Sequence, residues 1–181
     1  MTKREWKIIK NVLQPNKPGL DKFAIVGGFY YATDRYRLVR CEEGVYPLCD
    51  GVEIPVYIDD EKHPDYIQYM RKASMMEYEK VEIPYTAKQI RLWADYYYKI
   101  NKLRRPFNLG AKEGNVYIGI NPYYLADCLE TCRTSEIHIP NRYGEPILIS
   151  GNDYTWLVMP IALLGYDRDK KMTEICEVEK V

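Results

Sequence analysis

Two cysteines and a histidine are the residues of this 181-residue chain whose types and spacing best suit chemistry. Cys128 and Cys132 lie about one helical turn apart, and His138 follows in an alternating segment. A thiol beside an imidazole can act as a nucleophile, and all three side chains can bind a metal. However, a reactive cysteine needs an accessible, electropositive setting, whereas Cys128 falls on the apolar stripe of its expected helix. Because structural zinc also needs a fourth ligand, we favour core packing for Cys128 and predict no metal.

Other patterns of catalytic or phosphate-binding residues are weaker. His63 and His138 are far apart in sequence, and Gly27-Gly28 lacks the helix and lysine that follow a phosphate-binding loop. The acidic run Asp59-Asp60-Glu61 can be interpreted as a divalent-ion site or as a solvated loop, and the solvated loop is favoured. We therefore expect a protein that is not an enzyme and holds no cofactor.

Two segments, 2–13 and 86–103, combine an apolar stripe with a basic opposite face. Each starts with a capping-box pattern, at Thr2 and at Thr86, which predicts a helix. The cations assigned to these two faces are Lys3, Arg4, Lys7, Lys10, Lys88, Arg91, Lys99 and Lys102. Such faces are commonly only solvated, but they can also contact a phosphate backbone without reading bases. Periodicity alone leaves both interpretations open.

Short strand-like segments surround these helices. Apolar alternation and turn residues predict strands over 23–26, 29–32, 36–41, 52–58, 116–120, 136–139, 146–150 and 154–163. Gly27-Gly28 supplies the first hairpin turn, and Asn121-Pro122 starts a further helix. Residues 59–80 are interpreted as a junction, with a short helix after Pro64. Helices interleaved with antiparallel hairpins predict an α+β fold.

The composition is that of an ordinary soluble globular protein. The 26 Lys and Arg residues balance 26 Asp and Glu residues, and hydrophobic residues make up 46% of the chain. This balance excludes a histone-like basic protein but allows a local basic face. The 5 cysteines are irregularly spaced, the first residues lack the apolar run of a signal peptide, and no apolar run is long enough to span a membrane. We therefore expect a cytoplasmic protein without a disulfide framework or membrane contact.

Three segments, taken in order, resemble bacterial DNA polymerase sliding clamps, the beta subunit of DNA polymerase III. Residues 118–163, which begin IGINPYYLADCL and end YTWLVMPIAL, are similar to the C-terminal end of that family. Residues 30–39, YYATDRYRLV, resemble the A-T-D-G-x-R-L corner of its middle domain, with Arg35 in place of the glycine. His63-Pro64-Asp65-Tyr66 is similar to the F-P-D-Y that links its last two domains.

The resemblance implies a DNA-clamp-like fold of antiparallel sheets and amphipathic basic helices. Residues 1–75 would correspond to an abbreviated middle unit, residues 76–166 to the C-terminal unit, and residues 167–181 to a charged tail. A peptide-binding groove is implied between the corner, the linker and the final strand. Its residues by this comparison are Thr33, Tyr36, Arg37, Leu38, Pro64, Val158, Met159, Pro160 and Ile161.

The function implied by the resemblance is that of a clamp-like accessory protein in DNA replication or repair. Its partners would be duplex DNA, bound weakly and without sequence preference, and the clamp-binding peptide motifs of polymerases or clamp-loader-like proteins. A homo-oligomer is compatible with this function. The alternative is an interaction module that does not encircle DNA, such as a decoy that competes for the same peptides. The solution mass, measured by light scattering, separates the two.

Overall fold

Helices form at the capping residues that the sequence predicts. The computed structural model describes residues 2–42, 56–58, 66–100, 106–112, 116–133, 135–142 and 144–162. The side chains of Thr2 and Thr86 each accept a hydrogen bond from the N–H three residues on. The Glu or Gln side chain at that third position accepts one from the N–H of the threonine, which completes both capping boxes. The helices of the described part are α1 (Lys3–Lys10), α2 (Tyr66–Ser74), α3 (Ala87–Asp95), its π-helical continuation η2 (Tyr96–Ile100) and α4 (Pro122–Thr131).

Most strands belong to one eight-stranded sheet with the order β4-β1-β2-β3-β10-β9-β8-β5. All its pairs are antiparallel except β1 with β4, so the fold class is α+β as predicted. These strands are β1 (Phe23–Val26), β2 (Phe29–Thr33), β3 (Arg37–Glu42), β4 (Val56–Ile58), β5 (Tyr78–Val81), β8 (Glu136–Pro140), β9 (Ile147–Gly151) and β10 (Tyr154–Val158). A three-stranded sheet contains β6 (Phe107–Lys112), β7 (Val116–Ile120) and β11 (Ile161–Ala162).

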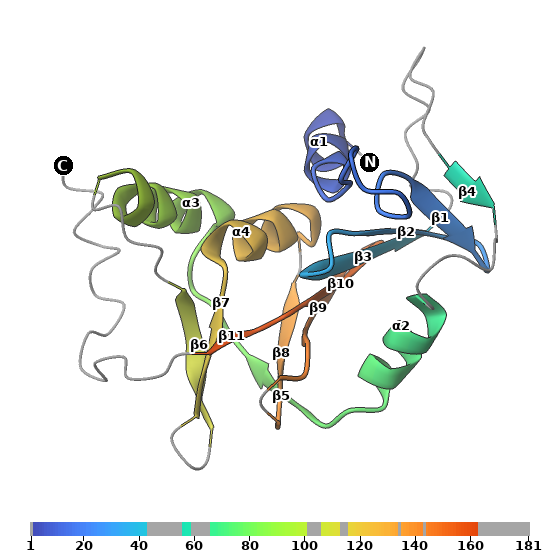
Figure 1. Cartoon of the computed structure of the whole chain (residues 1–181). Coiled ribbons are helices and arrows are strands. Elements are labelled where there is room, and N and C mark those ends of the chain that lie inside the picture. Colours follow the sequence, from blue (N-terminus) through green and yellow to red (C-terminus); the bar gives the residue numbers. More distant parts are fainter. Residues whose placement is uncertain are drawn as a thin grey trace.

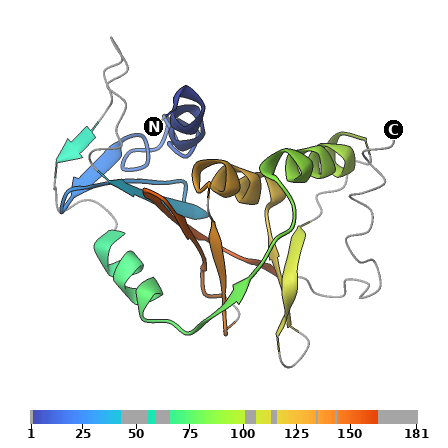
Figure 2. The same ribbon diagram turned by 180° about the vertical axis from the view of Figure 1, so that it is seen from behind.

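The helices cover the eight-stranded sheet unequally. Helices α1, α3 and α4 lie on one side, whereas α2 lies alone on the other (Figures 1 and 2). The larger core, under the three helices, includes the fully buried Trp156 of β10. The next residue, Leu157, belongs instead to the smaller core that contains Met70 and Ala73 of α2. Because side chains alternate across a strand, β10 packs against both layers.

The pairing of β3 with β10 joins parts of the chain that are distant in sequence. Leu38 lies opposite Leu157, and Arg37 lies opposite Val158. The eight-stranded sheet therefore continues across the boundary expected near residue 75. The division into units 1–75 and 76–166 stays a prediction, and the tail 167–181 lies outside the described residues.

The segment 154–163, predicted as one strand, is two strands in two different sheets. β10 ends at Val158, and β11 starts at Ile161 and pairs with β7. The Met159 N–H still donates to the Tyr36 carbonyl at 2.8 Å, but Pro160 has no N–H to continue the ladder. The chain crosses to the second sheet at this point (Figure 1).

Two other differences involve breaks in a regular pattern. Strand β6 was not expected, because the pairing register with β7 shifts between Asn108 and Gly110 and interrupts the alternation. The helix predicted over 86–103 is α-helical only to Asp95 and continues as a π-helical turn to Ile100. The segment predicted as one α-helix therefore changes helical type after Asp95, and whether its basic face continues stays a prediction.

Candidate functional site

The corner between β2 and β3 is held by its own side chains. Asp34 Oδ1 accepts hydrogen bonds from the N–H groups of Tyr36 and Arg37, both at 2.9 Å. The Thr33 hydroxyl donates to the Arg37 carbonyl at 2.8 Å and accepts from the Arg35 N–H at 3.1 Å. This is the network of an Asx turn, in which a short polar side chain replaces backbone pairing. The corner consequently presents Arg35 and Tyr36 outward, both of them exposed.

Arg35 occupies a backbone conformation that favours glycine, with φ at +78°. A left-handed conformation costs an ordinary L-residue about 1–2 kcal/mol, and a glycine at the same position avoids this cost. Part of the gain is lost again, because glycine has a larger conformational entropy in the unfolded chain. We expect Arg35→Gly to raise the free energy of unfolding by about 0.5–1 kcal/mol. Arg35→Val, with a β-branched side chain, is expected to lower it. Urea denaturation of the three proteins measures both changes, and a glycine variant less stable than wild type would contradict the assignment.

Arg37, predicted as a groove residue, is buried at 6% exposure in a network of ion pairs. Its Nε lies 3.0 Å from Asp34 Oδ2, and its Nη1 lies 2.5 Å from Asp127 Oδ2 on α4. The guanidinium also stacks on the Tyr124 ring, 4.3 Å from the centroid. Burial disfavours the charged guanidinium, but Asp127 and Asp34 outweigh burial and raise the pKa of Arg37. The side chain therefore fastens the corner to α4.

The same network extends to the cations of the other helices. Arg91 of α3 donates to Asp127 Oδ1 at 2.5 Å and to Glu130 Oε2 at 3.1 Å. Arg4 of α1 also pairs with Glu130. The acidic residues of α4 thus neutralise one predicted DNA-binding residue on each flanking helix.

The remaining predicted DNA-binding residues fall into three groups. Lys99 pairs with Asp95 at 2.9 Å, and Lys102 lies outside the described residues. The other four side chains are exposed and form no ion pair with any described residue: Lys3, Lys7, Lys10 and Lys88. Three of these four lysines are on α1, so the cationic surface is mainly the outer face of that helix.

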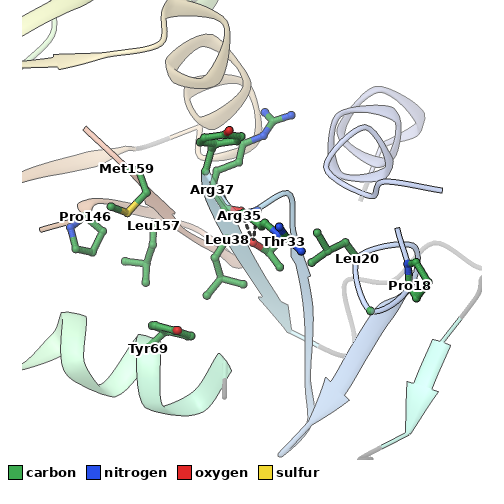
Figure 3. A pocket seen from close by; sticks show the side chains of 12 residues that line it. Pro18, Leu20, Thr33, Arg35, Arg37, Leu38, Tyr69, Pro146, Leu157 and Met159 are labelled. Atoms are coloured by element: carbon green, nitrogen blue, oxygen red, sulfur yellow. Dashed lines mark hydrogen bonds between the residues drawn. The ribbon is translucent and has the colours of Figure 1, made fainter. Parts of the chain in front are cut away.

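A hollow of about 460 Å³ lies beside the corner. Figure 3 shows it extending from Pro18 and Leu20 at one end to Pro146 and Met159 at the other, with Tyr69 of α2 facing the sheet. The predicted groove residues that line it are Thr33, Tyr36, Arg37, Leu38 and Met159. The structure thus brings together the corner and the end of β10, which the sequence separates widely.

Several lining residues were missed by the sequence analysis. They are Pro18, Gly19, Leu20, Arg35, Tyr69, Pro146 and Leu157. Leu157 had a usable signal, since strand alternation puts it on the opposite face from Val158. Tyr69 had none, because nothing in the local pattern of α2 places that helix over the sheet.

Three residues assigned to the groove lie elsewhere, and a fourth is not described. Val158 is fully buried in the larger core, on the face of β10 away from the hollow. Ile161, 38% exposed, lines a different hollow of about 730 Å³, because the chain has already crossed to the second sheet. Pro160 is half-buried at that crossing, and it lines neither hollow. Pro64 lies outside the described residues.

The second hollow, where Ile161 lies, has polar groups that bind one another. The Tyr123 hydroxyl donates to Asp95 Oδ1 at 2.8 Å, and Asp95 also pairs with Lys99. Burial, together with the hydrogen bond to Asp95, raises the pKa of Tyr123 to about 12. The side chains of Tyr123, Asp95 and Lys99 in this second hollow therefore already pair with one another.

The thiols considered for chemistry are core residues. Cys128 and Cys132 are fully buried, and burial raises the pKa of the Cys128 thiol well above its usual value and that of Cys132 to about 12. A thiol with a raised pKa is a poor nucleophile at neutral pH. His138, on β8, faces Glu136 at 3.6 Å. Within the described ranges no three His, Cys, Asp or Glu side chains are grouped to hold a metal ion, and His63 and Asp59-Asp60-Glu61 lie outside these ranges.

Comparisons with known proteins give little help with function. No protein-family model matches the chain, and no curated protein matches its sequence. Among solved structures, DNA polymerase III subunit beta from Borrelia burgdorferi, in complex with a natural product, is similar with a TM-score of 0.48 and 16% sequence identity. The similarity covers 90% of this chain and 63% of that one. None of the described helices is long and apolar enough to cross a bilayer.

Proposed function

We propose that this protein is a clamp-like accessory protein that binds extended peptides of partner proteins in the hollow beside the Asp34 corner. One observation carries the proposal: three large apolar side chains around the hollow are exposed to solvent, Tyr36 at 63%, Tyr69 at 57% and Met159 at 42%. Clustered exposure of this kind marks interaction surfaces in soluble proteins. The sequence resemblance supplies the class of partner, the clamp-binding peptide motifs of proteins in DNA replication or repair.

The size and lining of the hollow suit a short peptide. A volume of about 460 Å³ is within the range of ligand sites in proteins and accommodates a few bulky side chains. Leu38 and Leu157 form an apolar surface between α2 and the corner, and Met159 at the end of β10 can adapt to different anchors. We expect affinities on the order of micromolar, because the contact is small and the peptide loses freedom on binding.

The test is a titration with a fluorescent peptide that carries two bulky apolar anchors in an extended sequence. Fluorescence anisotropy is expected to show saturable binding to the wild-type protein. A peptide with both anchors replaced by alanine is the control, and it is expected to bind at least tenfold more weakly. Absence of binding to the anchor peptide at millimolar protein would refute the proposed function.

Duplex DNA is the second ligand that we propose, and we assign its binding to fewer residues than the sequence predicted. The supporting observation is the outer face of α1, where Lys3, Lys7 and Lys10 are exposed and form no ion pair with any described residue. Contacts of this kind bind phosphates without reading bases and weaken as salt rises. We therefore propose that duplex DNA binds weakly and non-specifically on the side of the sheet that carries α1.

We expect Lys7→Glu combined with Lys10→Glu to abolish duplex binding at low salt, because both charges face the phosphates. The matched control reverses Arg71 and Lys72, two exposed cations in the last turn of α2 on the opposite side of the sheet. This control has the same net charge as the Lys7→Glu, Lys10→Glu variant, and it is expected to bind DNA like the wild type. Electrophoretic mobility shifts measure both. Equal loss in the two variants would indicate a net-charge effect, and no wild-type binding would favour the decoy alternative.

A further inference from the structure

The rim of the hollow carries one positive charge that no described residue neutralises. Two cations line the hollow, Arg35 and Arg37, and no acidic residue is among the described residues that line it. The guanidinium of Arg37 is committed to Asp34 and Asp127. Arg35 is exposed, and its guanidinium forms no ion pair or hydrogen bond with any described residue.

The backbone of Arg35 is held in place, although its side chain pairs with no described residue. Its N–H donates to the Thr33 hydroxyl, and the two N–H groups that follow it donate to Asp34. The side chain thus leaves a rigid corner beside the exposed Tyr36 at the edge of an apolar surface. A peptide bound there would remove water from around the guanidinium, which strengthens any pair with a carboxylate. Arginine suits this pairing because its planar donors can bind both carboxylate oxygens.

We propose that Arg35 selects peptides that carry an acidic side chain beside their apolar anchors. This inference rests on the proposed function, since it names the chemistry of the peptide that occupies the hollow. Charge complementarity identifies the occupant. Among the described residues the lining is mostly apolar and Arg35 is its one cation without an ion pair, so the matching ligand is apolar with a single carboxylate. Arg35 acts as a specificity residue, and the apolar side chains supply most of the affinity.

The experiment compares pairs of peptides that differ only in whether one side chain is a charged carboxylate or a neutral amide. The anchor peptide is made with Asp at each non-anchor position in turn, and each peptide is paired with its Asn counterpart. At one position the wild-type protein is expected to bind the Asp peptide about fivefold more tightly than the Asn peptide. This preference is expected to fall as salt rises.

Two variants identify the residue responsible. Arg35→Gly suits the φ of +78°, so this variant is expected to fold and to bind both peptides equally. Arg35→Glu is expected to prefer the Asn peptide. Lys88→Glu, on α3 in the other helical layer, changes the net charge by the same amount and is expected to keep the wild-type preference.

The outcomes separate the two proposals. Equal binding of Asp and Asn peptides to the wild type at every position would overturn the role of Arg35 and leave the proposed function intact. A preference that persists in Arg35→Gly would also overturn it, since another group would then recognise the acid. If no anchor peptide binds, the proposed function fails and this inference fails with it.

Discussion

Arg37→Ala is expected to lower the free energy of unfolding by about 3 kcal/mol, the low end of the range for breaking a buried ion pair. The substitution leaves the buried Asp34 carboxylate without its guanidinium partner, although two backbone N–H groups still donate to it. Asp127 keeps its pair with Arg91, which limits the loss. The stacking of Arg37 on Tyr124 disappears as well. Urea denaturation followed by tryptophan fluorescence measures the change.

Arg40→Ala is the matched control on the same strand. Arg40 is half-buried, donates a hydrogen bond to the Thr155 hydroxyl at 3.1 Å and also interacts with the Tyr31 side chain. Its Cζ lies 4.7 Å from the centre of the Phe29 ring. Its replacement is expected to cost about 1 kcal/mol, because no buried charge is left behind. Equal costs for the two variants would mean that the Asp34–Arg37–Asp127 network does not hold the corner.

Met159→Asp is expected to weaken the binding of the anchor peptide by at least about tenfold. In the free protein the new carboxylate is solvated, since residue 159 is 42% exposed in the wild type. The bound peptide would cover it, and the cost of removing water from an unpaired charge would oppose binding. Any pairing with Arg35 would not rescue binding of an acidic peptide, because it would occupy the cation that the peptide requires. Fluorescence anisotropy gives the dissociation constants.

Ile161→Asp is the matched control for this substitution. Ile161 is two positions further along the chain and similarly exposed at 38%, but it lines the other hollow. Its replacement introduces the same charge and is expected to leave the peptide affinity unchanged. If Ile161→Asp weakens binding as much as Met159→Asp does, the peptide does not occupy the hollow beside the corner. A folded Met159→Asp variant with wild-type affinity would lead to the same conclusion.

Local chemistry made most helices and strands predictable from the sequence. The capping residues Thr2 and Thr86 mark helix starts that depend on neighbours three residues away, and the Gly27-Gly28 turn depends on backbone freedom alone. The failures came where tertiary pairing overrides local pattern. Strand β6 forms despite a register shift, and the chain after Val158 changes sheets at Pro160.

The candidate site was predictable only in part. The resemblance pointed to Thr33, Tyr36, Leu38 and Met159, which do line one hollow. It could not indicate that Arg37 is buried, because its acidic partner Asp127 lies on helix α4, far from strand β3 in the sequence. The interpretation of Arg91 as a DNA contact was limited in the same way, since a basic helix face shows its own cations but not the acids that a neighbouring helix brings to them.

The β3–β10 ladder has a consequence for folding. One wall of the hollow, at the corner, comes from an early part of the chain, and the other, at Leu157 and Met159, comes from a late part. Closing the long loop between them costs entropy before any of their contacts form, and pairings of this kind are intrinsically slow. A nascent or partly folded chain therefore has no binding surface, even when α1 and the first hairpin are already in place. Only molecules in which β3 and β10 have already paired can therefore bind a partner.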